Sequence, residues 1–239
     1  MARALRPWLT GVRHLMTSSR FRFELLTSEH QNSVIEFFCK HYLTSDPLWL
    51  AAGLKEPMVL PLAPYLYPLL TKHPVSFAVF SPENEMVGLK MNDIKTRDDD
   101  DIDIPLLLLP RLNWKIISVF EAFDGLESEV FYLAPEVKKW LYLNVGCIRR
   151  DYWRKGLATE MWKYSLNLAK EHGCEGAYSL ATNYKSQNGL LCMGFSPGKL
   201  IKYEKFFDDA LLSKKWRKYF GDKVKVENSE FIKLMVKTW

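Results

Sequence analysis

The sequence of 239 residues lacks the features that mark several common protein classes. Its four cysteines are far apart, with no CxxC pair and no histidine at ligand spacing, so neither a zinc site nor a disulfide framework is indicated. We expect no metal, and free thiols in a reducing compartment. The longest clean apolar run, 104–110, falls far short of the ~20 residues that span a bilayer, so no transmembrane segment is predicted.

Strong charge of one sign is also missing. The net charge of +5 is modest, and no basic stripe interleaved with aromatic residues occurs, which argues against a nucleic-acid partner. The acidic run at 97–103 has neither the ligand spacing nor the glycine of a calcium loop and reads as a solvated loop. With 48% apolar residues, the chain can bury one sizeable core.

The first 22 residues differ in kind from the rest, because they contain five arginines and no acidic residue. This composition is typical of a mitochondrial transit peptide, and several apolar residues can share one helical face. A disordered basic extension on a cytoplasmic protein is the alternative. We expect residues 23–239 to form a single domain.

Apolar spacing predicts most of the secondary structure. A capping box at 28–31 begins the first helix, and prolines divide the apolar stretch from 47 to 74 into loops and one short helix. The order of the later elements favours a mixed sheet with helices on its faces. The predicted helices are 29–41, 113–123, 156–172 and 186–193, and the predicted strands are 75–80, 86–91, 139–148, 176–181, 200–206 and 231–238.

One turn gathers positive charge where a helix begins. The strand 139–148 leads into Arg149, Arg150, Arg154 and Lys155, and Gly156 stands at the first turn of the next helix. Backbone N–H groups from about 154 to 159 have no intrahelical acceptor, and the helix dipole adds partial positive charge. The turn therefore predicts a phosphate or pyrophosphate site. It matches neither GxxxxGK(S/T) nor GxGxxG.

The turn does resemble the acetyl-coenzyme A loop of the GNAT acetyltransferases, whose pattern is Gln or Arg, two residues, Gly, one residue, then Gly or Ala. Here it reads WRKGLA at 153–158, with Trp153 as the departure. The segment 181–195, closing with Gly194 and Phe195, resembles the family segment beside the pantetheine. HYLTSDPLWL at 41–50 resembles the DEPL region of the insect-type arylalkylamine N-acetyltransferases, and FIKLMVKTW at 231–239 resembles their last strand.

This resemblance, which covers 23–239, implies an α/β (α+β) fold with a mixed, largely antiparallel sheet of six to seven strands flanked by helices. It also implies transfer of an acetyl group from acetyl-CoA to a small primary amine, such as an arylalkylamine, by direct attack in a ternary complex. We expect a monomer. The residues it assigns to the coenzyme are Cys147, Ile148, Arg149, Trp153, Arg154, Lys155, Gly156, Leu157, Ala158, Thr159, Asn183 and Ser186.

Acetyl transfer needs a neutral amine, whereas an alkylammonium has a pKa of about 10.4, so a base must remove a proton. The resemblance assigns this role to Asp46, at the position of the Glu in DEPL; Asp46 could instead only cap the turn before Pro47. Three aromatic residues, Trp49, Tyr65 and Trp114, are candidates for an arylalkylamine pocket, although each could equally be core.

The leaving thiolate needs a proton, which many relatives take from a tyrosine. Leu190 stands at that position, so Ser186 or Tyr184 is the remaining donor, with Ser186 as the N-cap of a short helix as the alternative. Cys147 is interpreted as a wall residue rather than a nucleophile. Because Trp153, Asp46 and Leu190 all depart from the family patterns, a catalytically weakened acyl-CoA-binding protein is a rival hypothesis. An acetyltransferase for polyamines or protein amino groups is another.

Overall fold

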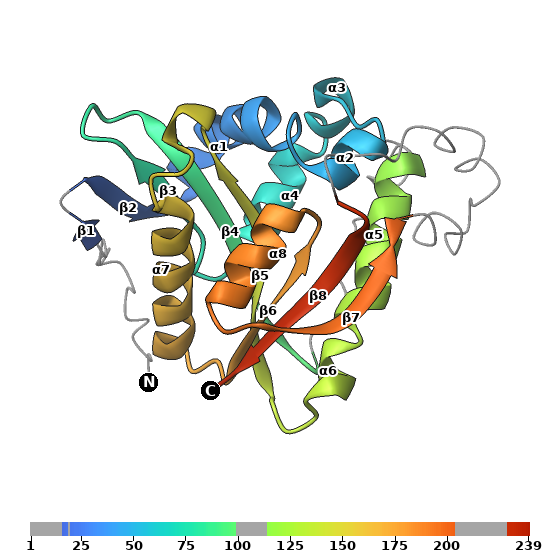
Figure 1. Cartoon of the computed structure of the whole chain (residues 1–239). Coiled ribbons are helices and arrows are strands. Elements are labelled where there is room, and N and C mark those ends of the chain that lie inside the picture. The colour runs from blue at the N-terminus through green and yellow to red at the C-terminus, as the bar shows by residue number, and fades with distance from the viewer. Residues whose placement is uncertain (1–15, 19, 99–113, 204–228) are drawn as a thin grey trace, which may run out of the picture.

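The computed structural model in Figure 1 describes residues 16–18, 20–98, 114–203 and 229–239. The apolar run 104–110, most of the acidic run and the end of the predicted strand 200–206 lie outside these ranges. Within them, no helix has the length and apolar character needed to cross a membrane. The described residues also contain no group of three His, Cys, Asp or Glu side chains that could hold a metal ion.

The centre of the molecule is one eight-stranded sheet with the order β1-β2-β3-β4-β5-β6-β8-β7. Every neighbouring pair is antiparallel except β5 and β6, which run parallel, so the predicted mixed and largely antiparallel sheet is confirmed. The count exceeds the predicted six to seven strands because β1 adds a strand of three residues. The strands are β1 (Met16–Ser18), β2 (Phe21–Leu25), β3 (Phe77–Phe80), β4 (Met86–Thr96), β5 (Lys139–Ile148), β6 (Gly176–Ala181), β7 (Ser196–Lys202) and β8 (Phe231–Thr238).

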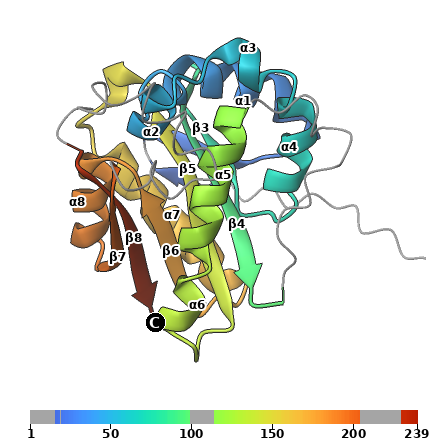
Figure 2. The ribbon, with the colours of Figure 1, turned by 90° about the vertical axis from the view of Figure 1, so that its right-hand side faces the viewer.

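Helices cover both faces of the sheet (Figures 1 and 2). On one face α1 and α4 pack against β3, β4 and the end of β5, and α2, α3, α5 and α6 pack beside them on β5, β6 and β8. On the other face lie α7 and α8. The helices are α1 (Gln31–Phe37), α2 (Pro47–Ala51), α3 (Glu56–Val59), α4 (Ala63–Leu70), α5 (Trp114–Glu127), α6 (Val130–Leu133), α7 (Leu157–Glu171) and α8 (Tyr184–Cys192).

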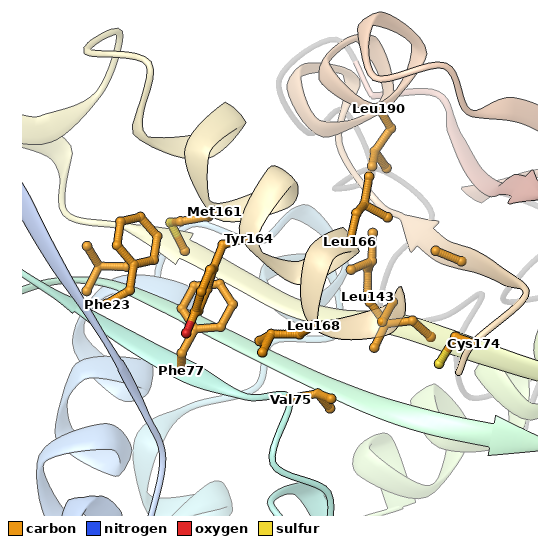
Figure 3. Packing of buried hydrophobic residues seen from close by; sticks show 14 of the residues in the cluster. Phe23, Val75, Phe77, Leu143, Met161, Tyr164, Leu166, Leu168, Cys174 and Leu190 are labelled. Atoms are coloured by element: carbon orange, nitrogen blue, oxygen red, sulfur yellow. The ribbon is translucent and has the colours of Figure 1, made fainter. Parts of the chain in front are cut away.

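The core under α7 holds that helix rigidly on the sheet. Figure 3 shows Met161, Tyr164 and Leu168 of α7 directed toward Phe23 and Phe77 of the sheet. The rings of Phe77 and Tyr164 meet edge to face, with 4.8 Å between their centroids. Aromatic contacts of this kind add stabilisation beyond the area that they bury, so the first turn of α7 has a fixed place relative to β5.

The segment rich in prolines differs from the prediction of loops and one short helix, since it forms α2, α3 and α4. Pro47, Pro57 and Pro64 each stand in the first two positions of a helix. A helix loses nothing there by the missing N–H of proline, so these residues begin helices rather than break them.

Other boundaries also differ; β4, for example, continues to Thr96 and α5 to Glu127, beyond their predicted ends. The cap of the first helix is Thr27 with His30, in place of the predicted box at 28–31; the Thr27 N–H donates to His30 Nδ1 at 3.0 Å. That helix then widens into a π-helical turn at Phe38–Tyr42. Strand β7 begins at Ser196, four residues before the predicted start at 200. The sheet itself begins at Met16, before residue 23. β1 pairs with β2, and β2 pairs with β3 along Arg22–Leu25.

Candidate functional site

The sheet opens between its two parallel strands. β5 and β6 are paired only from Trp140 with Gly176 to Tyr142 with Tyr178, although β5 continues to Ile148 and β6 to Ala181. At the point of divergence the Ser179 hydroxyl donates to the Leu143 carbonyl at 2.9 Å, and Asn144 forms a bulge in the pairing with β4. The unpaired halves leave strand backbone free to bind a ligand that enters between them. We call this opening the splay.

The predicted anion turn lies at the end of the splay, between β5 and α7. Arg154 and Gly156 both have left-handed backbones, with φ of 62° and 82°, and Gly156 is the N-cap of α7. Left-handed residues alternating with ordinary ones direct successive N–H groups into one concavity, which favours anions. A Cβ placed on Gly156 would meet no atom within 4 Å, so the backbone is open to a group as large as a pyrophosphate.

The cations of this turn are not equivalent. The Arg149 guanidinium forms ion pairs of 2.9 Å with both Glu85 and Asp151, and these neighbours raise its pKa further. Arg150, Arg154 and Lys155 are exposed. Arg149 therefore fixes the turn to the β3–β4 hairpin, and the exposed three supply charge for a ligand.

Trp153, the departure from the family pattern, has a structural contact that the sequence did not predict. Its Nε1–H donates to the carbonyl of Ile148 at 2.8 Å and so closes the turn on itself. Trp153 is also 39% exposed, and the Lys185 ammonium lies over its indole ring in a cation–π contact, 4.7 Å from the ring centroid. Because Lys185 belongs to α8, the contact joins the two helical sides of the splay.

Asp46 is buried at the start of α2, where it serves as the N-cap. Its Oδ1 accepts hydrogen bonds from the N–H groups of Leu48 at 3.0 Å and Trp49 at 3.2 Å, and its Oδ2 accepts one from the Thr182 hydroxyl at 2.6 Å. The nearby Tyr42 hydroxyl also lowers the pKa of this carboxylate. Burial raises the pKa of Asp46, and the hydrogen bonds oppose that rise. Asp46 therefore does cap α2, and the cap is also linked to the end of β6.

Three aromatic side chains from the segment around Asp46 pack against one another. Phe38 and Trp49 meet edge to face at 5.6 Å between centroids, and Tyr42 lies 4.9 Å from Phe38 and 6.2 Å from Trp49. Phe38 and Tyr42 are only partly buried. The π-helical turn supplies both of them, and such turns are frequent at functional sites.

The three predicted pocket residues are not equivalent. Trp49 is buried in the core cluster beneath α2 and α5, whereas Tyr65 is 40% exposed on α4 and is not part of that cluster. Trp114 is the first residue of α5. Trp49 lies next to Asp46, because its N–H donates to the carboxylate.

The predicted donor Ser186 is bound within its own helix. Its hydroxyl donates to the Asn183 carbonyl at 2.9 Å. Asn183 is the N-cap of α8, accepting from the Ser186 N–H at 2.8 Å, so the interpretation of Ser186 as N-cap is wrong by three residues. Leu190 is buried, whereas the Tyr184 ring is 37% exposed at the start of α8. Tyr184 is therefore the more accessible of the two candidate donors.

One buried group of the splay, Lys90, was missed by the sequence analysis. Lys90 of β4 is 3% exposed and donates to the Val145 carbonyl at 3.2 Å, and burial lowers its pKa to about 7. Cys147, beside it on β5, is buried and its pKa is raised, which suits a wall residue rather than a nucleophile. The available signal was a lysine inside the apolar strand 86–91.

A second missed group is Glu127 at the end of α5. Its Oε2 accepts from the Tyr178 hydroxyl at 3.1 Å, and the Tyr142 hydroxyl also donates to it. Burial raises the pKa of Glu127 to about 7, while Lys95 opposes the rise. The two tyrosine rings are stacked, 4.7 Å apart. A second carboxyl group thus lies on the same face of the sheet as Asp46, where β5 and β6 are still paired.

Comparison with known proteins agrees with this geometry. Residues 128–195, from the end of α5 to the start of β7, match the model described as the acetyltransferase (GNAT) family. The match includes the splay, the anion turn, α7 and α8. No curated protein sequence matches the chain.

Solved structures share the fold over nearly the whole chain. Arylalkylamine N-acetyltransferase 2 from Aedes aegypti is 22% identical with a TM-score of 0.72, covering 91% of this chain and 98% of its own. The putative arylalkylamine N-acetyltransferase 7 from the same mosquito is 16% identical with a TM-score of 0.76, covering 98% of both chains. A Drosophila melanogaster polyamine N-acetyltransferase is 13% identical with a TM-score of 0.64, covering 92% of this chain and all of its own.

Proposed function

Since the chain carries a GNAT acetyltransferase domain, we propose that it transfers an acetyl group from acetyl-CoA to a small primary amine, and that the amine is an arylalkylamine. The observation that carries the proposal is the anion turn with its left-handed Arg154 and Gly156, placed where the splay ends. A pyrophosphate bound there would direct the rest of the coenzyme between β5 and β6.

The residues present fit this donor. The N–H groups of the first turn of α7 and the exposed Arg150, Arg154 and Lys155 would bind the pyrophosphate, with Gly156 allowing close approach. The unpaired backbone of β5 and the N-terminus of α8 would hold the pantetheine arm. Acetyl-CoA supplies an activated acyl group, and the protein supplies its position.

The transfer forms one bond and breaks another. The amine nitrogen bonds to the acyl carbon and releases one proton, the carbon–sulfur bond breaks, and the coenzyme leaves as a thiolate that takes up one proton. Asp46 would accept the proton that the ammonium must lose, with the Thr182 hydroxyl, which is bonded to the carboxylate, as the relay. Tyr184 is the proposed proton donor to the thiolate, in preference to Ser186.

The acceptor class follows from the side chains around Asp46. Phe38, Tyr42 and Trp49 pack against one another, the Trp49 N–H is bonded to Asp46, and Phe38 and Tyr42 are partly exposed. A ring at the far end of the amine would pack against them, while the ammonium approached Asp46. A second candidate acceptor, a polyamine, is favoured by Glu127, because a second carboxyl on the same face could bind a second ammonium.

A weakened acyl-CoA-binding protein is the rival function, favoured by the commitment of Ser186 to its helix and by Leu190. Calorimetric titration with acetyl-CoA, followed by steady-state release of CoA with tryptamine, dopamine and spermidine, separates these functions. The proposal expects binding and turnover, fastest with an arylalkylamine. Binding without turnover would establish the rival, fastest turnover of spermidine would establish the polyamine enzyme, and no binding would refute all three.

A further inference from the structure

Lys90 is a lysine where the sheet has no evident use for a charge. It lies on β4, 3% exposed, and makes no ion pair with a carboxylate in the part of the chain that the structure describes. Its ammonium has one hydrogen-bond acceptor there, the carbonyl oxygen of Val145 at 3.2 Å. Burying a charge with so little compensation is costly, which points to a function other than stability.

The path of the side chain depends on Gly146, its partner across β4 and β5. A Cβ on Gly146 would lie 3.5 Å from Lys90 Nζ and 3.6 Å from its Cδ, so the lysine runs alongside the bare backbone of this glycine. The ammonium is therefore placed against the strand that forms one side of the splay.

The register shows which way the peptide between Val145 and Gly146 points. The Arg149 N–H donates to the Val87 carbonyl at 2.9 Å, and hydrogen-bonded pairs alternate along an antiparallel ladder. Cys147 with Leu89 and Val145 with Met91 are then also hydrogen-bonded pairs, so the Val145 carbonyl faces β4. In a trans peptide the next N–H points the opposite way, so the Gly146 N–H faces the splay.

We propose that Lys90 is a positioning residue for acetyl transfer: by binding the Val145 carbonyl it fixes and polarises the peptide whose Gly146 N–H receives the thioester oxygen. A donor on the carbonyl of a peptide makes its N–H a stronger donor, since linked hydrogen bonds polarise one another. The stronger N–H stabilises the negative charge that develops on the oxygen as the amine attacks. This inference rests on the proposed function.

The thioester carbonyl itself provides the test. Acetyl-CoA labelled with carbon-13 at the carbonyl is bound to the wild type and to Lys90→Met, and the carbonyl stretch is recorded by isotope-edited infrared difference spectroscopy, alongside the Kd for CoA and kcat. Methionine has a similar length and no charge. Lys95→Met is the matched control, because Lys95 lies on the same strand but pairs with Asp93.

We expect the bound wild-type band below the frequency of free acetyl-CoA, and the Lys90→Met band shifted back toward it. The expected loss of kcat is on the order of tenfold, less than when an oxyanion donor is removed outright, with the Kd for CoA changed by less than about twofold. Lys95→Met should match the wild type. A Lys90→Met band and kcat equal to wild type would overturn the proposal.

A second variant, Lys90→Gln, keeps an uncharged donor and should give an intermediate band. If Lys90→Met fails to fold, Lys90→Gln decides: a wild-type band would overturn the role of the charge. Absence of any bound band from the wild type would instead overturn the proposed function, and this inference with it.

Discussion

The Thr182 hydroxyl at the end of β6 donates a hydrogen bond of 2.6 Å to the carboxylate of Asp46 at the start of α2, across 136 positions of sequence. The bond connects the helices on one face of the sheet to the mouth of the splay. Asp46 is consequently a helix cap and also a buried carboxyl group. Its pKa is lowered by the hydrogen bond from Thr182, which follows the strand that leads into α8.

Replacing Asp46 by Asn should separate these two roles. Asparagine is as good an N-cap as aspartate, and its Oδ1 can still accept from Leu48 and Trp49, so the melting temperature should change little. The amide cannot take a proton, so kcat should fall by roughly 10²-fold or more. Steady-state kinetics and thermal denaturation measure both effects. Wild-type kcat in a folded Asp46→Asn protein would exclude Asp46 as the base.

Replacing Thr182 by Val should move the pH dependence of the reaction. The Thr182 hydroxyl favours the ionised carboxylate and so lowers the pKa of Asp46, against the effect of burial. Without it the pKa rises further, the base is protonated at a higher pH, and the acid limb of kcat/KM shifts upward. The pH profiles of wild type and Thr182→Val give the direction. A limb in the same place, or one shifted downward, would contradict a base at Asp46.

Replacing Gly156 by Val should weaken coenzyme binding. A β-branched side chain is strained at φ of 82° and would occupy the open space where a pyrophosphate would lie. We expect the Kd for CoA to rise at least about tenfold, a loss of some 1.4 kcal/mol. Gly173→Val is the matched control, because Gly173 has φ of 71°, is equally open, and follows the other end of α7. Equal effects of both variants in calorimetry would mean that strain alone is responsible.

Replacing Lys90 by Met should stabilise the protein at neutral pH. The pKa of Lys90 falls from 10.5 in the unfolded chain to about 7 in the folded one. Between these values the unfolded chain binds more protons, so wild-type stability rises with pH, and the charged lysine is most destabilising below pH 7. The expected gain is at most on the order of 5 kcal/mol there, and it disappears above about pH 10.5. Chemical denaturation at pH 6 and pH 9.5 checks the trend, and a larger gain at pH 9.5 would refute it.

Local patterns in the sequence were sufficient for the elements that form the walls of the site. The strands 139–148, 176–181 and 231–238 have the predicted bounds, and α7 differs by one residue at each end. Each of these segments has a clear apolar periodicity. Their local structural preferences therefore agree with the packing of the whole fold.

The contacts that make the site specific could not be predicted in the same way. Asp46 and Thr182 are joined by folding, and the direction of the Gly146 N–H depends on a register shifted by a bulge at Asn144. The three short helices were a different error. Asp46 followed by Pro47 is a cap followed by a first-position proline, a signal that was present and was read only as a turn.

The pairing of β2 with β3 sets a limit on any maturation of this protein by proteolysis. Phe21 is buried and stacks edge to face with Tyr152 of the anion turn, and Arg22 pairs with Phe80. A protease that cut after residue 22 would therefore remove the Phe21 ring, which supports the turn. It would also leave Phe80 of β3 without its partner in β2. If a leader is removed in the cell, we expect the mature chain to begin upstream of Phe21.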